Sequence, residues 1–306
     1  MSNFTKTVLA VIVGMLIISI LPWIFWLIFI GIIAAGTSST GNVNSPGILK
    51  LDLSTTSITE QVKEDFTYST GAGAQYSKTI GLWDAVNAIN VAAEDPNIKH
   101  IYLKTDGNVN SMATCEEIRT ALDNFRKSGK GVIAYIESPG TLGYYVASVS
   151  DKIYMGRYHG GNINFNGVGG RMIFLKDLLD KFGVNMQLIR HGKYKSAGEM
   201  FIRNSSSPEN REQNERMVVS MWETMRKTIS EARNIPEERL DAAIDNLELC
   251  LPEDFLNAGL VDELVGRPEL ENHIAVLDVK DDIKDVNLIN FAAYAEAKAE
   301  LNLRSK

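Results

Sequence analysis

The chain has 306 residues, of which 45% are hydrophobic and 23% charged, a balance typical of a globular protein rather than a disordered one. Its net charge of −7 argues against nucleic-acid binding, because proteins of that class carry a basic face. Cys115 and Cys250 lie far apart and the four histidines lack a metal-ligand spacing. We therefore expect no disulfide, metal or cofactor, and we expect both cysteines in the core.

The first 35 residues are predicted to be a membrane anchor. Residues 8–35 contain no charged side chain, and about 20 apolar residues suffice to cross a bilayer. A cleavable signal peptide is the alternative, but it would have a shorter apolar region. Lys6 precedes the span and the next cation is Lys50, so the N-terminus is predicted to be cytoplasmic and the bulk of the chain extracytoplasmic.

Residues 36–47 are rich in Gly, Ser and Asn and are predicted to be a linker, after which a folded domain spans 48–265. Short apolar runs that predict strands alternate with patterns that predict helices, which indicates an α/β fold built from βαβ units. The predicted strands are 48–54, 99–105, 131–137, 152–156 and 185–190, and the predicted helices are 82–95, 111–129, 172–183, 208–233, 236–244 and 252–265. The pattern weakens over 266–306, which we expect to be a connector or tail with one helix over 289–301.

The chemistry of this chain is not indicated by a familiar motif. The glycine-rich stretches at 71–74 and 167–170 lack the phosphate-binding spacings, and no GxSxG sequence is present. A basic cluster, formed by Arg190, His191, Lys193 and Lys195, lies beside small residues and the hydroxyl of Ser196. Burial and neighbouring cations disfavour a charged ammonium, so a lysine in such a setting can act as a base towards a serine hydroxyl. On spacing alone, a solvated surface lysine is the simpler interpretation.

The stretch HGKYKSAGEMFIRNSSSPENREQNERMV (191–218) resembles the region around the base lysine of the signal peptide peptidase A family, membrane peptidases with a serine/lysine dyad. The segments GILKLDLS, IYLKTDGN, GKGVIAYIESPGTLGYYVASVSDKIYM and LCLPEDFLNAGLVDEL also resemble that family. The resemblance implies a Clp protease/crotonase-like spiral fold, homo-oligomeric assembly in the bacterial inner membrane, and signal peptides or other apolar peptides as substrates. It implies that Lys195 is the general base, with Lys193 at most supporting it.

Two departures from the family pattern concern the nucleophile and the oxyanion loop. Thr141 stands where the family has its serine, and DGNVNS (106–111) replaces a PGG turn that supplies backbone N–H donors. A base without these two parts resembles the N-terminal repeat of the tandem form of the family. We therefore expect the serine to come from a second domain or a homologous subunit, the chain being either half of a longer product or a shortened homologue.

Two other functions are open at this point. A catalytically inactive assembly or binding module of the same fold would explain the missing serine and glycines. A crotonase-like enzyme acting on acyl thioesters shares the fold, but it too needs an oxyanion loop and has little use for a membrane span.

Overall fold

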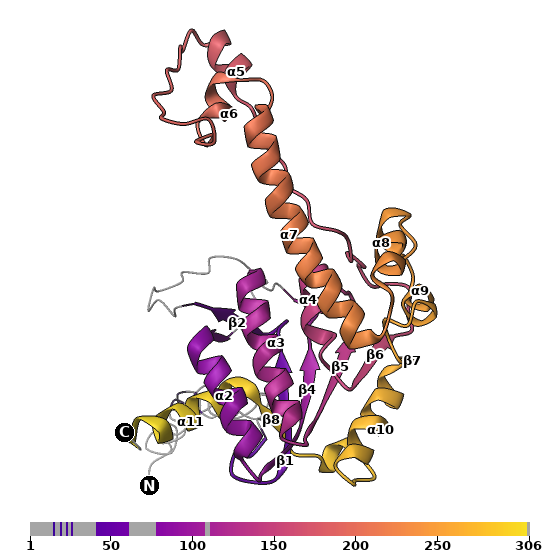
Figure 1. The fold of residues 1–306 in the computed structure, drawn as a ribbon. Helices are drawn as coiled ribbons and strands as arrows, with labels where there is room; N and C mark the ends of the chain where they lie inside the picture. Colours follow the sequence, from indigo (N-terminus) through magenta and orange to yellow (C-terminus); the bar gives the residue numbers. More distant parts are fainter. Residues whose placement is uncertain are drawn as a thin grey trace, which may run out of the picture. The chain divides into compact units, whose positions relative to one another are not determined.

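The structure is a computed structural model that describes Met15, Ser19, Trp23, Trp26 and residues 41–60, 78–107 and 111–304, with side chains as far as 298. It divides into two units, Met1–Gly41 and Asn42–Lys306, and the second contains the α/β fold (Figure 1). The predicted membrane span lies outside the described residues apart from the four isolated positions. Within the described ranges, no helix has the length and apolar character needed to span a bilayer.

The second unit is built on a six-stranded sheet in the order β7-β6-β5-β4-β1-β8, and every pairing in it is parallel. Its strands are β1 (Gly47–Asp52), β4 (Ile98–Lys104), β5 (Gly131–Ile136), β6 (Lys152–Gly156), β7 (Glu263–Val265) and β8 (Leu288–Asn290). Two further strands, β2 (Thr56–Thr59) and β3 (Lys78–Gly81), form a separate parallel pair. The predicted α/β fold with a parallel sheet is confirmed.

Both faces of the main sheet are covered, which is why its strands are nearly continuous apolar runs. In β4 the side chains of Ile101 and Leu103 belong to one buried cluster and that of Tyr102 to another. The first cluster includes side chains from α2 (Leu82–Glu94) and α3 (Met112–Lys127), and the second includes side chains from α10 (Arg267–Leu277). In Figure 1 these helices flank the sheet.

The longest helices begin and end where local signals place them. Ser111 caps α3 by accepting the N–H of Thr114 at 3.1 Å, and the chain leaves that helix through Gly129 at a φ of 87°. Helix α7 (Pro208–Arg233) begins after the Ser207 cap with a proline in its first turn. The other helices of the described ranges are α4 (Thr141–Ala147), α5 (Lys176–Lys181), α6 (Glu199–Ile202), α8 (Glu237–Asp245), α9 (Pro252–Asn257), the short 3-10 turn η1 (Ile283–Asp285) and α11 (Phe291–Arg304).

Several local predictions differ from the structure. Residues 185–190, expected as a strand, are extended chain outside both sheets, and the helix expected over 172–183 is reduced to α5. The helix expected over 252–265 ends at Asn257, and its last residues form strand β7 instead. Cys115 is buried as predicted, whereas the prediction for Cys250 is wrong because that side chain is exposed.

The C-terminal segment is packed into the fold rather than lying beside it as the expected connector. Strand β8 pairs with β1 at the edge of the main sheet, where Ile289 lies opposite Leu49. Phe291 and Tyr294 of α11 are fully buried, and the Tyr294 hydroxyl donates to the Asp95 carboxylate at 3.0 Å. This segment thus completes the sheet although its own sequence pattern is weak. The pattern does not reveal this packing, because the partners lie more than 190 residues earlier in the chain.

Candidate functional site

Lys195 lies in a lobe formed by residues 171–200 and the N-terminal turns of α7 (Figure 1). The lobe borders an open cavity of about 950 Å³. Its lining combines apolar side chains such as Met172 and Leu188 with the amides of Gln213 and Asn214. Three residues of the basic cluster line the cavity, namely Arg190, His191 and Lys195. The structure therefore brings three of the four singled-out cations to one hollow.

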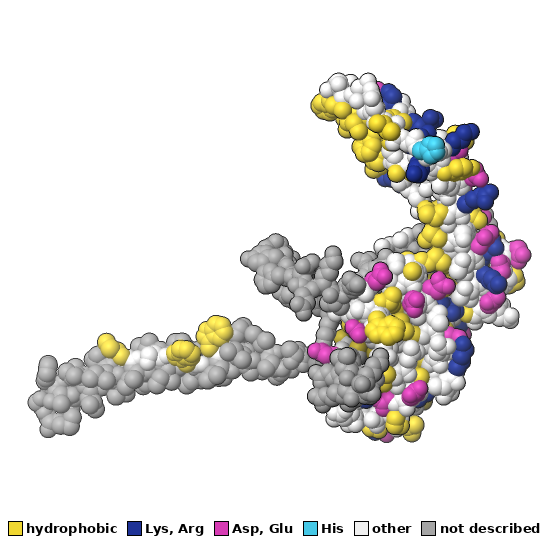
Figure 2. Space-filling view, turned by 60° about the vertical axis from the view of Figure 1, so that its left-hand side comes forward, with side chains coloured by type: hydrophobic (Ala, Val, Ile, Leu, Met, Phe, Trp, Pro, Cys, Tyr) yellow, Lys and Arg dark blue, Asp and Glu magenta, His cyan; other side chains and the backbone are white. Residues whose placement is uncertain are grey.

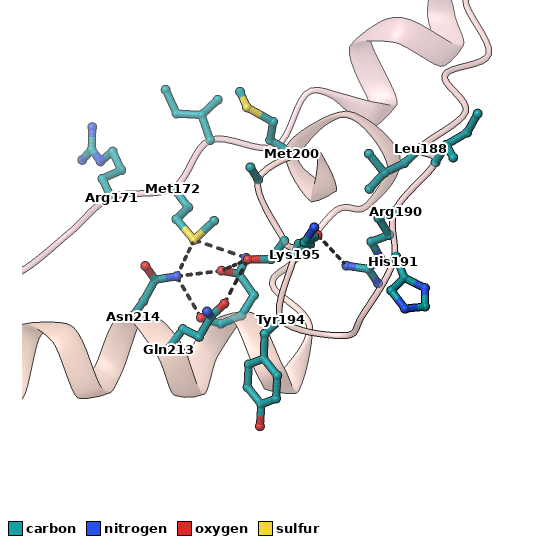
Figure 3. A pocket seen from close by; sticks show the side chains of 16 residues that line it. Arg171, Met172, Leu188, Arg190, His191, Tyr194, Lys195, Met200, Gln213 and Asn214 are labelled. Atoms are coloured by element: carbon teal, nitrogen blue, oxygen red, sulfur yellow. Dashed lines mark hydrogen bonds between the residues drawn. The ribbon is translucent and has the colours of Figure 1, made fainter.

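Within the single chain, Lys195 is exposed to solvent rather than enclosed by protein. Figure 3 shows it between Arg190 and the side chains contributed by α7. Lys193 is more peripheral, with a side chain that is 83% exposed and an acidic neighbour, Glu209, at 4.0 Å. The base role of Lys195, which requires a neutral amine, stays a prediction that concerns the assembled protein.

The hydroxyl groups that line this cavity, among the described residues, already donate to acceptors of the same chain. Ser196 donates to Asn210 Oδ1 at 3.1 Å, and Tyr194 donates to Glu212 Oε2 at 2.9 Å. Neither proton is directed towards the Lys195 amine. The lobe thus presents an amine together with apolar walls, and its own hydroxyls serve to hold the lobe together.

Thr141, the residue at the position of the family serine, is not among the residues that line the cavity. It is the first residue of α4, and its hydroxyl is engaged twice by Asn166: it donates to the backbone carbonyl at 2.6 Å and accepts the backbone N–H at 2.9 Å. Both the proton and a lone pair of this hydroxyl are used in hydrogen bonds to the backbone of Asn166, so the hydroxyl fixes the start of α4 to that segment. The geometry thus gives no support to Thr141 as a nucleophile.

The end of β4 is also closed by the chain itself. The half-buried carboxylate of Asp106 accepts the backbone N–H of Ser138 at 2.7 Å and that of Glu137 at 2.8 Å. Burial raises the pKa of Asp106, against the opposing effect of these two N–H donors. Gly107 passes so close to the Leu53 carbonyl that a Cβ atom would lie 2.4 Å from that oxygen. The backbone donors at this sheet edge are therefore occupied by an internal anion.

Sequence reasoning missed Glu199, a carboxylate with 0% exposure in the first turn of α6. It accepts Arg190 Nη1 at 2.8 Å, the backbone N–H of Ser207 at 3.0 Å and Asn210 Nδ2 at 3.3 Å. Burial alone would raise its pKa, but the hydrogen bonds from Ser207 and the charge of Arg190 outweigh burial and lower the pKa to about 2. The only sign of its burial in the sequence was that Glu199 is a single acidic residue among small and apolar ones, next to the basic cluster.

Acidification is expected to weaken the folded state through Glu199. Because its pKa falls from the ordinary 4.5 to about 2 on folding, its contribution to stability is complete above pH 4.5 and is lost as the pH falls towards 2. Urea unfolding at pH 6 and pH 3 measures this loss for the natural chain and for Glu199→Gln. The variant should lose less between the two pH values, and an equal loss in both proteins contradicts the assignment.

Many apolar side chains of the Lys195 lobe are exposed to solvent. Figure 2 shows them gathered at the end of the molecule that carries α5 and α6, with Lys and Arg side chains on the adjoining surface. The exposed apolar residues of this part are Met172, Ile173, Leu178, Phe182, Val184, Met186, Ile189 and Tyr194. Contiguous apolar surface of this kind marks a binding or assembly surface in a soluble domain.

No group of three or more His, Cys, Asp or Glu side chains with a spacing suited to a metal ion occurs among the described residues. The groups that the structure offers at the candidate site are the amine of Lys195 and the apolar surface beside it. We treat this lobe as the candidate active-site contribution of the chain.

Comparisons with known proteins point to one family. Residues 124–280 match the model of peptidase family S49. The chain is 32% identical over 235 residues to Protease 4 of Haemophilus influenzae, covering 72% of this chain and 37% of that protein. It is 34% identical over 209 residues to Protease 4 of Salmonella typhi, covering 66% and 34%, respectively. The chain thus spans about a third of the length of these two relatives.

A plant relative and a solved structure complete the comparison. The chain is 30% identical over 173 residues to the chloroplastic serine protease SPPA of Arabidopsis thaliana, covering 56% of this chain and 25% of that protein. A crystal structure described as an enoyl-CoA hydratase/isomerase from Acinetobacter baumannii aligns over 73% of this chain and 75% of its own, with 13% identity and a TM-score of 0.33. The family match covers Lys195, α7 and the strands β5, β6 and β7 of the main sheet. The chain therefore belongs to peptidase family S49, the signal peptide peptidase A family that its motifs resemble.

Proposed function

We propose that this chain is a subunit of a membrane-anchored serine endopeptidase and that it supplies Lys195 as the general base. The observation that carries the proposal is the position of that amine. It lines a cavity of about 950 Å³ in which every lining hydroxyl of the described chain is already committed to another acceptor. A base without a nucleophile of its own requires a serine from a second domain or from a homologous subunit.

The proposed reaction is acyl transfer. The neutral Lys195 amine accepts the proton of the incoming serine hydroxyl while its oxygen attacks the scissile carbonyl carbon. The resulting ammonium gives that proton to the leaving amine, the C–N bond breaks and an acyl-enzyme remains. Water, deprotonated by the same amine, then attacks the ester carbonyl and releases the acid product together with the serine.

Assembly would supply what the isolated chain lacks. Lys195 is exposed here, and an exposed amine is a poor base at neutral pH because water stabilises its charged form. A partner that covers the surrounding apolar surface would exclude water from the amine and favour its neutral form. The same surface suits apolar peptide substrates, of which signal peptides released into a membrane are the class that we propose.

We place the protein in the bacterial inner membrane, with a cytoplasmic N-terminus, an extracytoplasmic α/β domain and a homo-oligomeric arrangement. The support is the uncharged segment of residues 8–35 and the family membership. An anchor would hold the domain next to peptides that leave the bilayer.

A catalytically inactive assembly module is the second candidate. It is favoured by the Asp106 carboxylate, which fills the backbone donors of Glu137 and Ser138, and by the doubly engaged hydroxyl of Thr141. These contacts close the part of the fold in which the family carries its nucleophile. A subunit that contributes the base alone would carry the same contacts, so activity of the assembly is what separates the two candidates.

Reconstitution separates the two candidates. A signal peptide carrying a fluorophore and a quencher at its ends is incubated with this chain, with a serine-bearing S49 domain, and with both after co-expression. We expect cleavage above background only in the co-expressed mixture. A mixture no faster than the serine-bearing domain alone would support the inactive module, and full activity of this chain alone would contradict a borrowed nucleophile.

A further inference from the structure

The Lys195 segment is anchored by a buried ionic network. One guanidinium nitrogen, Arg190 Nη1, donates both to Glu199 Oε1 at 2.8 Å and to the backbone carbonyl of Lys195 at 3.3 Å. Figure 3 shows this second bond as the direct link between Arg190 and Lys195. The backbone that carries the amine is therefore tied to a carboxylate four residues further along.

The second carboxylate oxygen of Glu199 links Ser196 to the start of α7. Glu199 Oε2 accepts the backbone N–H of Ser207 and the side-chain amide of Asn210, and Asn210 Oδ1 in turn accepts the hydroxyl of Ser196. The backbone N–H of Glu199 also bonds the Ser196 carbonyl at 2.9 Å. Lys195 and Ser196 are thus fixed from both sides by groups that converge on Glu199.

The negative charge at this position has a definite use. A carboxylate with 0% exposure is costly to bury unless it is paired and hydrogen-bonded, and here it has three donors. The Arg190 side chain is 31% exposed and has Glu199 as its ion-pair partner. With Arg190 held by this carboxylate, its second N–H is aimed at the Lys195 carbonyl. A neutral side chain at position 199 leaves Arg190 without that constraint.

We propose that Glu199 is a positioning residue for the catalytic amine, acting through Arg190 on the backbone of Lys195. This inference rests on the proposed function, because it assigns a purpose to Glu199 only if Lys195 is the base. A misplacement of a reacting group by about 1 Å can cost about 10²-fold in rate, so a backbone tether of this kind has a measurable catalytic effect.

The test is a set of variants in the co-expressed, serine-bearing assembly with the fluorogenic signal peptide as substrate. Glu199→Gln keeps the shape and removes the charge, and Arg190→Lys keeps the charge and removes the planar fork. We expect each to lower kcat by about 10- to 100-fold with KM changed by less than about 2-fold. The double variant should be little worse than either single variant, because the two residues act on Lys195 as one unit.

Asp241 provides the matched control. It accepts Trp222 Nε1 at 2.8 Å and Arg226 Nη1 at 2.6 Å, so it joins α7 to α8 through another arginine–carboxylate ion pair, one that is more exposed than that of Glu199. Asp241→Asn should lower the melting temperature of the assembly and leave kcat within about 2-fold. Circular dichroism at the assay temperature establishes that each variant is folded. If Glu199→Gln does not fold, Arg190→Lys, which keeps the buried carboxylate paired, decides the question.

The outcomes distinguish this inference from the proposed function. If Lys195→Ala inactivates the assembly while folded Glu199→Gln or Arg190→Lys behaves like Asp241→Asn, the positioning role is overturned and the base assignment stands. A fold-reduction of kcat in the double variant that equals the product of the two single reductions also overturns it. If Lys195→Ala retains full activity, the proposed function itself fails.

Discussion

Replacing Lys195 with alanine is expected to lower the peptidase activity of the serine-bearing assembly by about 10³-fold, the scale on which a general base contributes. In the proposed mechanism the amine accepts the proton for serine attack and donates it to the leaving group, so its loss should affect kcat far more than KM. Initial rates of signal-peptide cleavage across a range of substrate concentrations measure this split.

Two further substitutions make the Lys195 result specific. Lys193→Ala removes a neighbouring lysine whose side chain is 83% exposed, and activity should stay within about 2-fold of the natural assembly. Lys195→Arg keeps a cation but cannot offer a neutral nitrogen, because the guanidinium stays protonated in proteins. Full activity of the arginine variant would show that position 195 supplies charge rather than a base.

Replacing Phe291 with alanine is expected to lower the free energy of unfolding by about 3 to 5 kcal/mol, the usual cost of removing a large buried aromatic side chain. Phe291 is 1% exposed and is the first residue of α11, directly after the edge strand β8. Its removal leaves a cavity between α11 and the main core. Urea unfolding of the full chain, followed by circular dichroism, gives the change.

Val276→Ala is the control for the same C-terminal segment. This α10 side chain is 61% exposed, so its truncation should change the free energy of unfolding by less than about 0.5 kcal/mol. If Phe291→Ala is as mild as Val276→Ala, residues 266–306 do not contribute to the core in solution and the expected connector is restored.

The two parts of the fold that concern catalysis differ in how far the chain itself occupies them. The half of the fold that would carry a nucleophile holds two internal contacts, Asp106 with the backbone of Glu137 and Ser138, and Thr141 with Asn166. The lobe around Lys195 instead keeps an open cavity and an apolar surface. This division supports the proposal that the chain contributes Lys195 and that a partner contributes the nucleophile.

Local patterns alone were sufficient for the central strands and the longest helices. Strands such as β5 and β6 are short apolar runs buried on both faces. In an α/β chain a run of this length and composition is typical of a central strand. The start of α7 depends on Ser207 and Pro208, whose effects act within one turn. These elements were predictable because their causes lie inside the segments themselves.

Tertiary structure decided the rest, because the causes lie far away in the sequence. Residues 185–190 alternate like a strand, yet a strand forms only where a neighbouring strand supplies its hydrogen bonds, and these residues lie outside both sheets. Strand β8 has three residues and a weak pattern, and it exists because β1 offers an edge to pair with. The resemblance of residues 191–218 to the family indicated Lys195 as a candidate base, whereas the burial of Glu199 depends on contacts with Arg190, Ser207 and Asn210 that only the folded chain brings together.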